Sequence, residues 1–140
     1  MQPLVHRLPL RVYYEDTDFS GVVYHASYLR FMERGRTEFL REAGVMQRDW
    51  HAGPERFFFV VRKMTIEWLK PARMDDQLVV ETSVAEVRGA SLVMRQAVTR
   101  DGEALVTAEA VVVGVIGERA ARLPPALKAA LAGLMAGPAA

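Results

Sequence analysis

Two aspartates and a histidine lie close together near the start of the chain, at a spacing suited to acid–base chemistry. Asp16 and Asp18 flank Thr17, and His25 follows after a bend that contains Gly21. The residues after His25 repeat with a helical period, so Asp18 precedes a helix N-terminus, whose free N–H groups attract anions. A carboxylate beside such a dipole is the arrangement that hydrolysis of an activated acyl group needs.

Each of these residues also has an ordinary structural interpretation. Asp16 and Asp18 are typical of turns and helix caps. If the turn is extended, only one of the two carboxylates points toward the helix, and Asp18 is favoured because it is nearer the glycine bend. Gly21 either supplies a positive φ or lets a ligand approach the backbone. His25 either donates to a substrate or orients water, or is a partly exposed residue at a helix start.

A long helix over residues 24–43 must position this group. Apolar or small residues recur at helical spacing and predict one buried stripe, formed by Tyr28, Phe31, Met32, Gly35, Phe39 and Ala43. Charged residues mostly fill the opposite face, where the spacing of Glu33 and Arg36 predicts an ordinary surface ion pair. Gly44 is the expected stop at the C-terminal end.

The rest of the chain predicts strands and short turns. A first strand is expected over residues 8–14, with Pro9 favouring an edge position or bulge. After a loop over residues 47–55, four long strands are expected at Phe57–Leu69, Gln77–Arg88, Ser91–Arg100 and Glu103–Ile116. Asp101-Gly102 is a strong hairpin signal, and consecutive hairpins imply an antiparallel sheet.

These elements predict an α+β fold in which one helix covers a single face of the sheet. The other face and the sheet edges then need cover, for which self-association is the expected remedy. The 140 residues, of which 51% are apolar, fit one domain over residues 1–140. Its tail, residues 124–140, is either a short helix or a frayed end.

Composition excludes several classes of protein. The net charge of +1 from 18 basic and 17 acidic residues argues against bulk attraction to nucleic acid or membranes. The absence of cysteine excludes disulfides, thiolate metal sites and cysteine nucleophiles. No secretory signal and no apolar run of about 20 residues is present, so the expected location is cytoplasmic, with no membrane span.

Motifs for metal or cofactor chemistry are also missing. His6, His25 and His51 lie in unrelated segments without metal-ligand spacing. The chain has neither a glycine-rich phosphate loop nor a Gly-x-Ser-x-Gly elbow. We therefore expect no metal and no organic cofactor. Arg88 precedes Gly89-Ala90-Ser91 at a hairpin end, where a flexible cation can reach a phosphate.

The stretch 12–36 resembles the signature of the 4-hydroxybenzoyl-CoA thioesterase-like hotdog proteins, and is most similar to their Tol–Pal-associated acyl-CoA thioesterase (YbgC-like) branch. The matching residues are Val12-Tyr13-Tyr14-Glu15-Asp16-Thr17-Asp18, Gly21-Val22-Val23-Tyr24-His25, Tyr28-Leu29-Arg30-Phe31, Glu33-Arg34 and Arg36-Thr37-Glu38. The resemblance implies a hotdog fold, a long antiparallel sheet wrapped around one central helix. It also implies homodimers or homotetramers with the active site at the subunit interface.

The resemblance further assigns roles to individual residues. Asp18 matches the catalytic aspartate of the family, and the amide that polarises the thioester carbonyl falls near Tyr24-His25. Substrate contacts are implied at Thr17, Gly21, Val22 and Val23, and a contact to pantetheine or a nucleotide phosphate at Arg88. Many relatives have Asn where Ser27 stands, which affects the expected shape of the pocket.

The expected activity is hydrolysis of acyl-CoA to free acid and CoA, with Asp18 as base or nucleophile. One alternative is a hotdog hydratase or dehydratase, but its His-Phe-Pro and Asp-x-x-x-x-His motifs are absent. Another is a non-catalytic protein that binds acyl-CoA or bridges envelope-associated partners. The sequence leaves open the acyl length, aromatic or aliphatic preference, use of carrier-protein thioesters, and the choice between dimer and tetramer.

Overall fold

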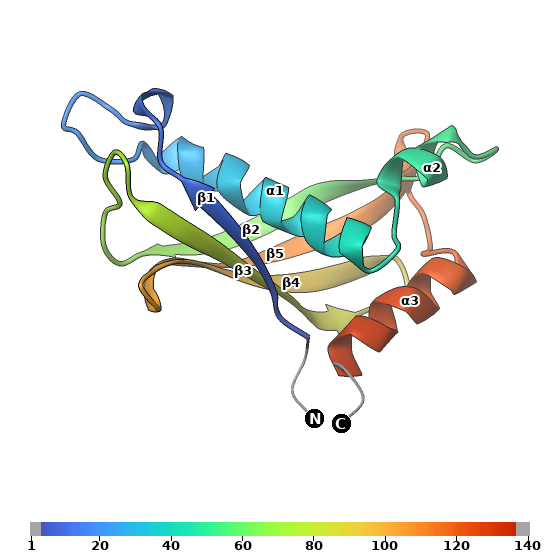
Figure 1. Cartoon of the computed structure of the whole chain (residues 1–140). Coiled ribbons are helices and arrows are strands. Elements are labelled where there is room, and N and C mark those ends of the chain that lie inside the picture. The colour runs from blue at the N-terminus through green and yellow to red at the C-terminus, as the bar shows by residue number, and fades with distance from the viewer. Residues whose placement is uncertain (1–3, 137–140) are drawn as a thin grey trace.

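The protein folds into a curled sheet wrapped around one helix, as the computed structural model of residues 4–136 shows (Figure 1). The sheet is antiparallel and six-stranded, in the order β1-β3-β4-β5-β2, and β6 pairs with β5. The predicted α+β arrangement, a long antiparallel sheet around one central helix, is therefore confirmed.

The four long strands follow the predicted bounds to within one residue at each end. The strands are β1 (His6–Arg11), β2 (Phe58–Trp68), β3 (Gln77–Val87), β4 (Ser91–Arg100), β5 (Glu103–Ile116) and β6 (Arg119–Ala120). Asp101 and Gly102 join β4 to β5 with φ values of 52° and 81°. These positive values at both central residues give the tight hairpin that the Asp-Gly pair predicted.

The first strand ends earlier than predicted. Strand β1 stops at Arg11, and Tyr14–Asp16 form a 3₁₀ turn, η1, instead of continuing the strand. The Asp16 carboxylate accepts the N–H of Tyr13 at 2.9 Å, which turns the chain away from the sheet. Pro9 lies in β1, which is an edge strand as expected, so its missing N–H costs no ladder bond inside the sheet.

The central helix α1 (His25–Glu42) buries the predicted stripe against the concave face of the sheet. Phe31 and Met32 are almost fully buried, at 1% and 0% exposed. Gly35 allows close contact with the sheet, since a Cβ there would lie 2.6 Å from Val80 Cγ1. Gly44, with φ +88°, follows the last helical turn as the expected stop.

The predicted surface ion pair between Glu33 and Arg36 is wrong. Arg36 is buried, and its Nη1 donates to Gln96 Oε1 at 2.8 Å. Gln96 Nε2 in turn donates to the Met32 carbonyl at 2.8 Å and to Thr82 Oγ1 at 3.0 Å. The sheet curls around α1 and contacts more of its circumference than a flat sheet would, so a residue at the edge of the stripe becomes buried.

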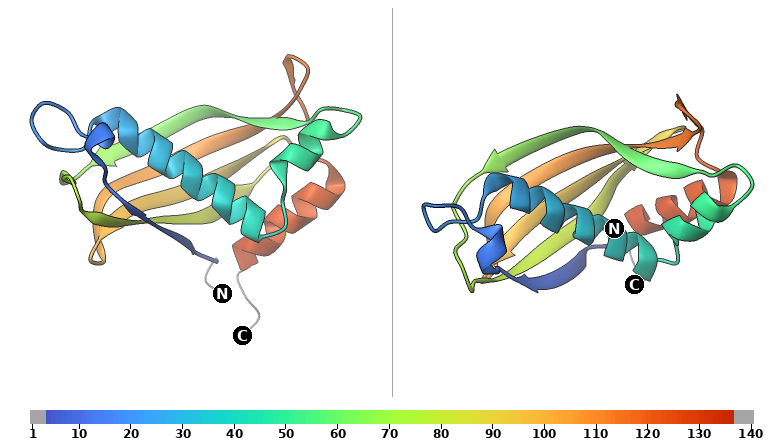
Figure 2. Two further views of the ribbon diagram at one scale, coloured as in Figure 1. Left: turned by 45° about the horizontal axis from the view of Figure 1, so that its top comes forward. Right: turned by 90° about the horizontal axis from the view of Figure 1, so that it is seen from above.

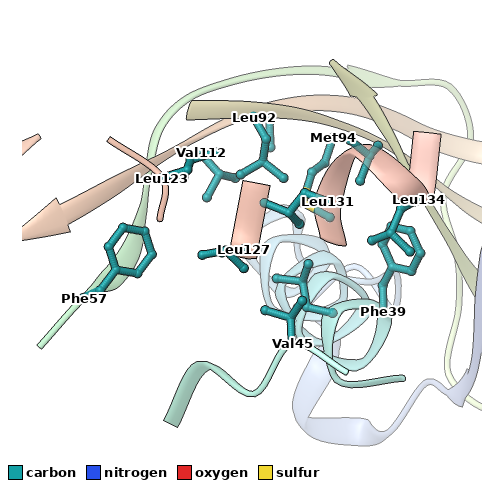
Figure 3. Close-up of a cluster of buried hydrophobic side chains, with 13 residues drawn as sticks. Phe39, Val45, Phe57, Leu92, Met94, Val112, Leu123, Leu127, Leu131 and Leu134 are labelled. Carbon is teal, nitrogen blue, oxygen red and sulfur yellow. The ribbon is translucent and has the colours of Figure 1, made fainter. Parts of the chain in front are cut away.

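Two shorter helices close one end of the molecule. Helix α2 (Gln47–Ala52) occupies most of the segment predicted as a loop, and α3 (Pro125–Ala136) follows β6. Figure 3 shows leucines of α3 packed against Phe39 and Val45 and against side chains of the sheet. The tail is therefore helical over Pro125–Ala136, and residues 137–140 lie outside the described part of the chain.

The opposite end of α1 is less covered. The loop between η1 and α1 projects from the body of the molecule, away from α2 and α3 (Figure 2). None of the helices formed by residues 4–136 has the length and apolar content needed to cross a membrane.

Candidate active site

The residues around Asp18 form a closed loop between η1 and α1. Tyr24 N–H donates to the Asp16 carbonyl at 2.8 Å, and Thr17 pairs with Val23 in an antiparallel bridge. Further out, Asp18 N–H donates to the Val22 carbonyl at 2.9 Å. The loop is thus a short hairpin whose base is fixed to the start of the helix.

A four-residue turn forms the tip of this loop. Gly21 N–H donates to the Asp18 carbonyl at 3.1 Å, and Gly21 has φ +86°. A side chain at this φ would be strained, which explains the glycine. Phe19, also at the tip, is fully exposed.

The Asp18 carboxylate is exposed and is bonded to its own turn. Its Oδ1 accepts the Ser20 hydroxyl at 2.5 Å and the Ser20 N–H at 2.8 Å. The Ser20 hydroxyl, helped by backbone N–H groups, lowers the pKa of Asp18 below its usual value. The turn-forming role holds for Asp18 in the single chain, where its carboxylate faces solvent, and the lowered pKa favours its ionised form.

The N-terminus of α1 is uncapped. Tyr24 at the N-cap makes no side-chain cap bond, and the first turn contains no acidic residue. Within residues 4–136, the N–H groups of His25 and Ala26 have no acceptor, whereas that of Tyr24 is occupied by Asp16. Of the two amides expected at Tyr24-His25, only that of His25 is free for a ligand. The positive end of the α1 dipole is therefore open to an oxyanion.

A hollow of about 270 Å³ adjoins this helix start. It is lined by Val23, His25, Tyr28, Trp68, Leu69, Lys70 and Pro71. The Trp68 ring lies 6.0 Å from the His25 ring and 5.5 Å from the Tyr28 ring, measured between centroids. The Tyr28 hydroxyl accepts the Ala72 N–H at 2.9 Å, which fixes the segment that follows β2 against the helix.

The other predicted loop residues take structural positions beside this hollow. Thr17 Oγ1 donates to the Tyr14 carbonyl at 2.7 Å, so its hydroxyl is occupied within the turn. Val22 pairs with Arg73 in a bridge, and Val23 is buried. These residues fix the loop to the segment that follows β2.

Arg88 is not brought to the same place within one chain. Arg88 follows the last residue of β3, Val87, which pairs with Leu92. The other end of β3 begins at Gln77, which pairs with Arg11 near the Asp18 loop. Eleven residues of extended chain separate the two ends, roughly 36 Å. Arg88 is exposed and donates to Glu86 through Nε and Nη2, both at 3.0 Å.

Sequence reasoning missed several residues at this site. Trp68 reaches the helix start from the far end of β2, a contact between distant segments that no local pattern announces. Ser20 gives the carboxylate its hydrogen bonds, a common turn arrangement that was readable from Asp18-x-Ser20. Ser27 was expected to affect the shape of the pocket, but its bond to the Asp16 carbonyl was not predicted; its place in the first helical turn was the available signal.

Exposed apolar side chains gather around the open end. They are Tyr13, Tyr14, Phe19, Tyr24, Trp68, Leu69 and Met74. Such a concentration on a surface marks a site of interaction. Among residues 4–136 there is no group of three or more histidine, aspartate or glutamate side chains placed to hold a metal.

Comparison with known proteins identifies the family. A model described as the thioesterase-like superfamily matches residues 12–131. The chain is 50% identical over 116 residues to the acyl-CoA thioester hydrolase YbgC of Escherichia coli, covering 82% of this chain and 85% of that protein. It is 47% identical over 93 residues to the acyl-CoA thioesterase YbgC of Haemophilus influenzae, covering 66% of this chain and 68% of that protein.

The solved structures agree. A probable thioesterase from Bartonella henselae superposes with a TM-score of 0.82 at 42% identity, covering 86% of this chain and 99% of that one. The expected hotdog fold is thereby confirmed. The chain belongs to the thioesterase-like superfamily and, within it, to the family of the YbgC acyl-CoA thioesterases.

Proposed function

We propose that this protein hydrolyses acyl-CoA thioesters, with Asp18 as the catalytic carboxylate and the His25 amide as the group that polarises the carbonyl. The observation that carries this proposal is the uncapped start of α1, which adjoins a hollow and follows directly on the loop that carries the Asp18 carboxylate. Family membership supports the same chemistry.

The reaction follows from these positions. The thioester carbonyl oxygen lies against the free N–H groups at the helix start, which stabilise the negative charge that develops on it. Asp18 either attacks the carbonyl carbon or removes a proton from the attacking water. The C–S bond then breaks, and CoA leaves as a thiolate that takes up a proton. If water attacked, the acyl group leaves directly as the free acid. If Asp18 attacked, the acyl group is left on Asp18 as a mixed anhydride, and water hydrolyses this anhydride to the free acid and regenerates the carboxylate.

The site needs a second copy of the chain, because the Asp18 carboxylate faces solvent in one copy. Strand β2 lies at the edge of the sheet and exposes Val60, Val61 and Trp68. A long edge strand with exposed apolar side chains is the surface that a protein covers by pairing. We therefore place the interface of a homodimer at β2, with a tetramer formed from two such dimers.

The cytoplasmic location stays a prediction.

Antiparallel pairing of two β2 strands would bring Arg88 of one chain to the site of the other. Val61 pairs with Val112, which pairs with Leu92, so the Val61 end of β2 lies level with the Arg88 hairpin. The Trp68 end lies at the open helix start. Antiparallel pairing brings the Val61 end of one chain toward the Trp68 end of the other. Arg88 of one chain then lies at the site that contains Asp18 of the other chain. There a phosphate of CoA replaces Glu86 as the anion that Arg88 binds.

Two single variants and their mixture test this proposal. Asp18→Asn removes the base and is expected to lower kcat by about 10²- to 10⁴-fold with the melting temperature unchanged, because general-base catalysis contributes this much and the side chain is exposed. Arg88→Ala is expected to raise KM for acyl-CoA. Thiol release from a panel of short, long and benzoyl acyl-CoAs is the measurement.

Mixing the two variants tests the shared site. A dimer of one Asp18→Asn chain and one Arg88→Ala chain has one intact site if the two residues come from different chains, so activity at low substrate is restored. It has none if they act within one chain. Full activity of purified Asp18→Asn protein would contradict the assignment, and binding of acyl-CoA without hydrolysis by the wild type would indicate a carrier protein.

A further inference from the structure

We infer that Ser27 and Arg30 are positioning residues that hold the Asp18 loop in register with the open start of α1. Together with Asp16 they form a hydrogen-bonded group, called here the clamp. This inference rests on the proposed function, because it assigns the clamp to the placement of the Asp18 carboxylate.

The clamp joins the base of the loop to the first turn of the helix. Ser27 is 1% exposed, and its Oγ donates to the Asp16 carbonyl at 3.1 Å. The same carbonyl accepts Tyr24 N–H at 2.8 Å. A carbonyl oxygen accepts two hydrogen bonds, so both of its positions are filled by residues of the helix start. Asp16, two residues before Asp18, is therefore held to the helix start by two hydrogen bonds.

Arg30 completes the group from the next turn of the helix. Its Nη2 donates to Ser27 Oγ at 3.0 Å and lies 3.8 Å from Asp16 Oδ1. The guanidinium only donates and the carbonyl only accepts, so the Ser27 hydroxyl must point its single hydrogen at Asp16 and accept from Arg30. The other carboxylate oxygen of Asp16 accepts Tyr13 N–H. Arg30 thus fixes the orientation of the Ser27 hydroxyl.

The position of the catalytic carboxylate depends on this group. Among the described residues, 4–136, the side-chain bonds of Asp18 go only to Ser20 in its own turn, so they hold the turn together and do not fix it to the helix. The base of the loop, at Asp16 and Tyr24, sets the distance from that carboxylate to the His25 amide. Reacting groups displaced by about 1 Å can lose up to about 100-fold in rate, so a looser base lowers turnover without removing any group that touches substrate.

Kinetics of Ser27→Ala test the clamp, because alanine removes one oxygen and suits a helix. We expect kcat to fall about 10- to 100-fold with KM changed less than about twofold. Arg30→Gln is expected to have a smaller effect in the same direction, and Arg30→Lys to restore most of it. Arg34→Gln is the matched control, since Arg34 is exposed on the same helix and has no partner within residues 4–136.

A double-mutant cycle separates positioning from a structural role. In an Asp18→Asn background there is no carboxylate left to position, so Ser27→Ala should change the residual rate less than about twofold. An equal loss in both backgrounds, or a wild-type kcat in Ser27→Ala, would overturn the inference.

Hydrogen exchange gives a readout that does not depend on activity. Ser27→Ala is expected to speed exchange of the Asp18 and Tyr24 amides, whose bonds close the loop, while Arg34→Gln leaves them unchanged. Unchanged exchange in Ser27→Ala would refute the clamp. A wild-type protein that releases no thiol from any acyl-CoA would refute the proposed function instead.

Discussion

The two ends of helix α1 differ in how the protein completes them. At the C-terminal end the chain turns at Gly44, and leucines of α3 pack against Phe39 of the helix (Figure 3). At the N-terminal end no side chain of the described part of the chain caps the helix, and aromatic side chains such as Phe19 and Tyr24 are exposed. One end is closed by the chain itself and the other is left open.

This difference separates stability from chemistry along a single helix. The closed end buries leucines that remove apolar surface from water, which is the main favourable term in folding. The open end leaves helix N–H groups without acceptors and a carboxylate that is bonded within its own exposed turn. This arrangement contributes little to stability but leaves donors for a substrate. Substitutions at either end of the helix, or where the helix packs on the sheet, should therefore separate stability from activity.

The largest effect is expected from Leu131→Ala at the closed end. Leu131 of α3 is fully buried in the apolar cluster that α3 forms with α1 and the sheet. Its truncation should lower the free energy of unfolding by about 2–5 kcal/mol. Urea unfolding followed by circular dichroism measures this loss. The kcat of the folded protein should stay at the wild-type value, and a large fall in kcat below the transition would show that the two ends are coupled.

Glycine to alanine substitutions at two helical positions should have opposite signs. Alanine favours a helix by about 1 kcal/mol over glycine. At Gly35 the added Cβ lies 2.6 Å from the buried Val80 side chain, so an overpacking cost of about 1–3 kcal/mol outweighs that gain. At Gly133 in α3 no atom of residues 4–136 would lie within 4 Å of the added Cβ, so stability should rise by about 0.5–1 kcal/mol. Thermal or urea unfolding of both variants gives the answer, and equal shifts would contradict the close contact between α1 and the sheet.

The smallest effect is expected from Ser20→Ala at the open end. The Ser20 hydroxyl is the main cause of the lowered pKa of Asp18, so its removal should raise that pKa toward the ordinary value. Because the base must be ionised, activity falls as the pH drops through this pKa. The acid limb of the kcat/KM profile should therefore move to higher pH, with little change at neutral pH. Ser83→Ala on β3 is the control, and an unmoved acid limb would mean that another group controls it.

Local patterns predicted most of the elements because each depends on neighbouring residues. The strand bounds of β3, β4 and β5 followed from alternation and from the Asp101-Gly102 turn. The helix followed from its apolar stripe, and its stop from Gly44. The first strand was predicted too long because the bond from Tyr13 N–H to the Asp16 carboxylate turns the chain, and strand periodicity does not include such a bond.

The sequence by itself determined the family, the central helix and its place after an acidic turn, because the residues that specify them are contiguous. Only the tertiary structure decided that Arg36 is buried, that Trp68 lies beside His25, and that Arg88 lies at the other end of the sheet from Asp18. These facts depend on how far the sheet curls and on which distant segments meet. Both result from packing the whole chain at once, and no short stretch of sequence carries that information.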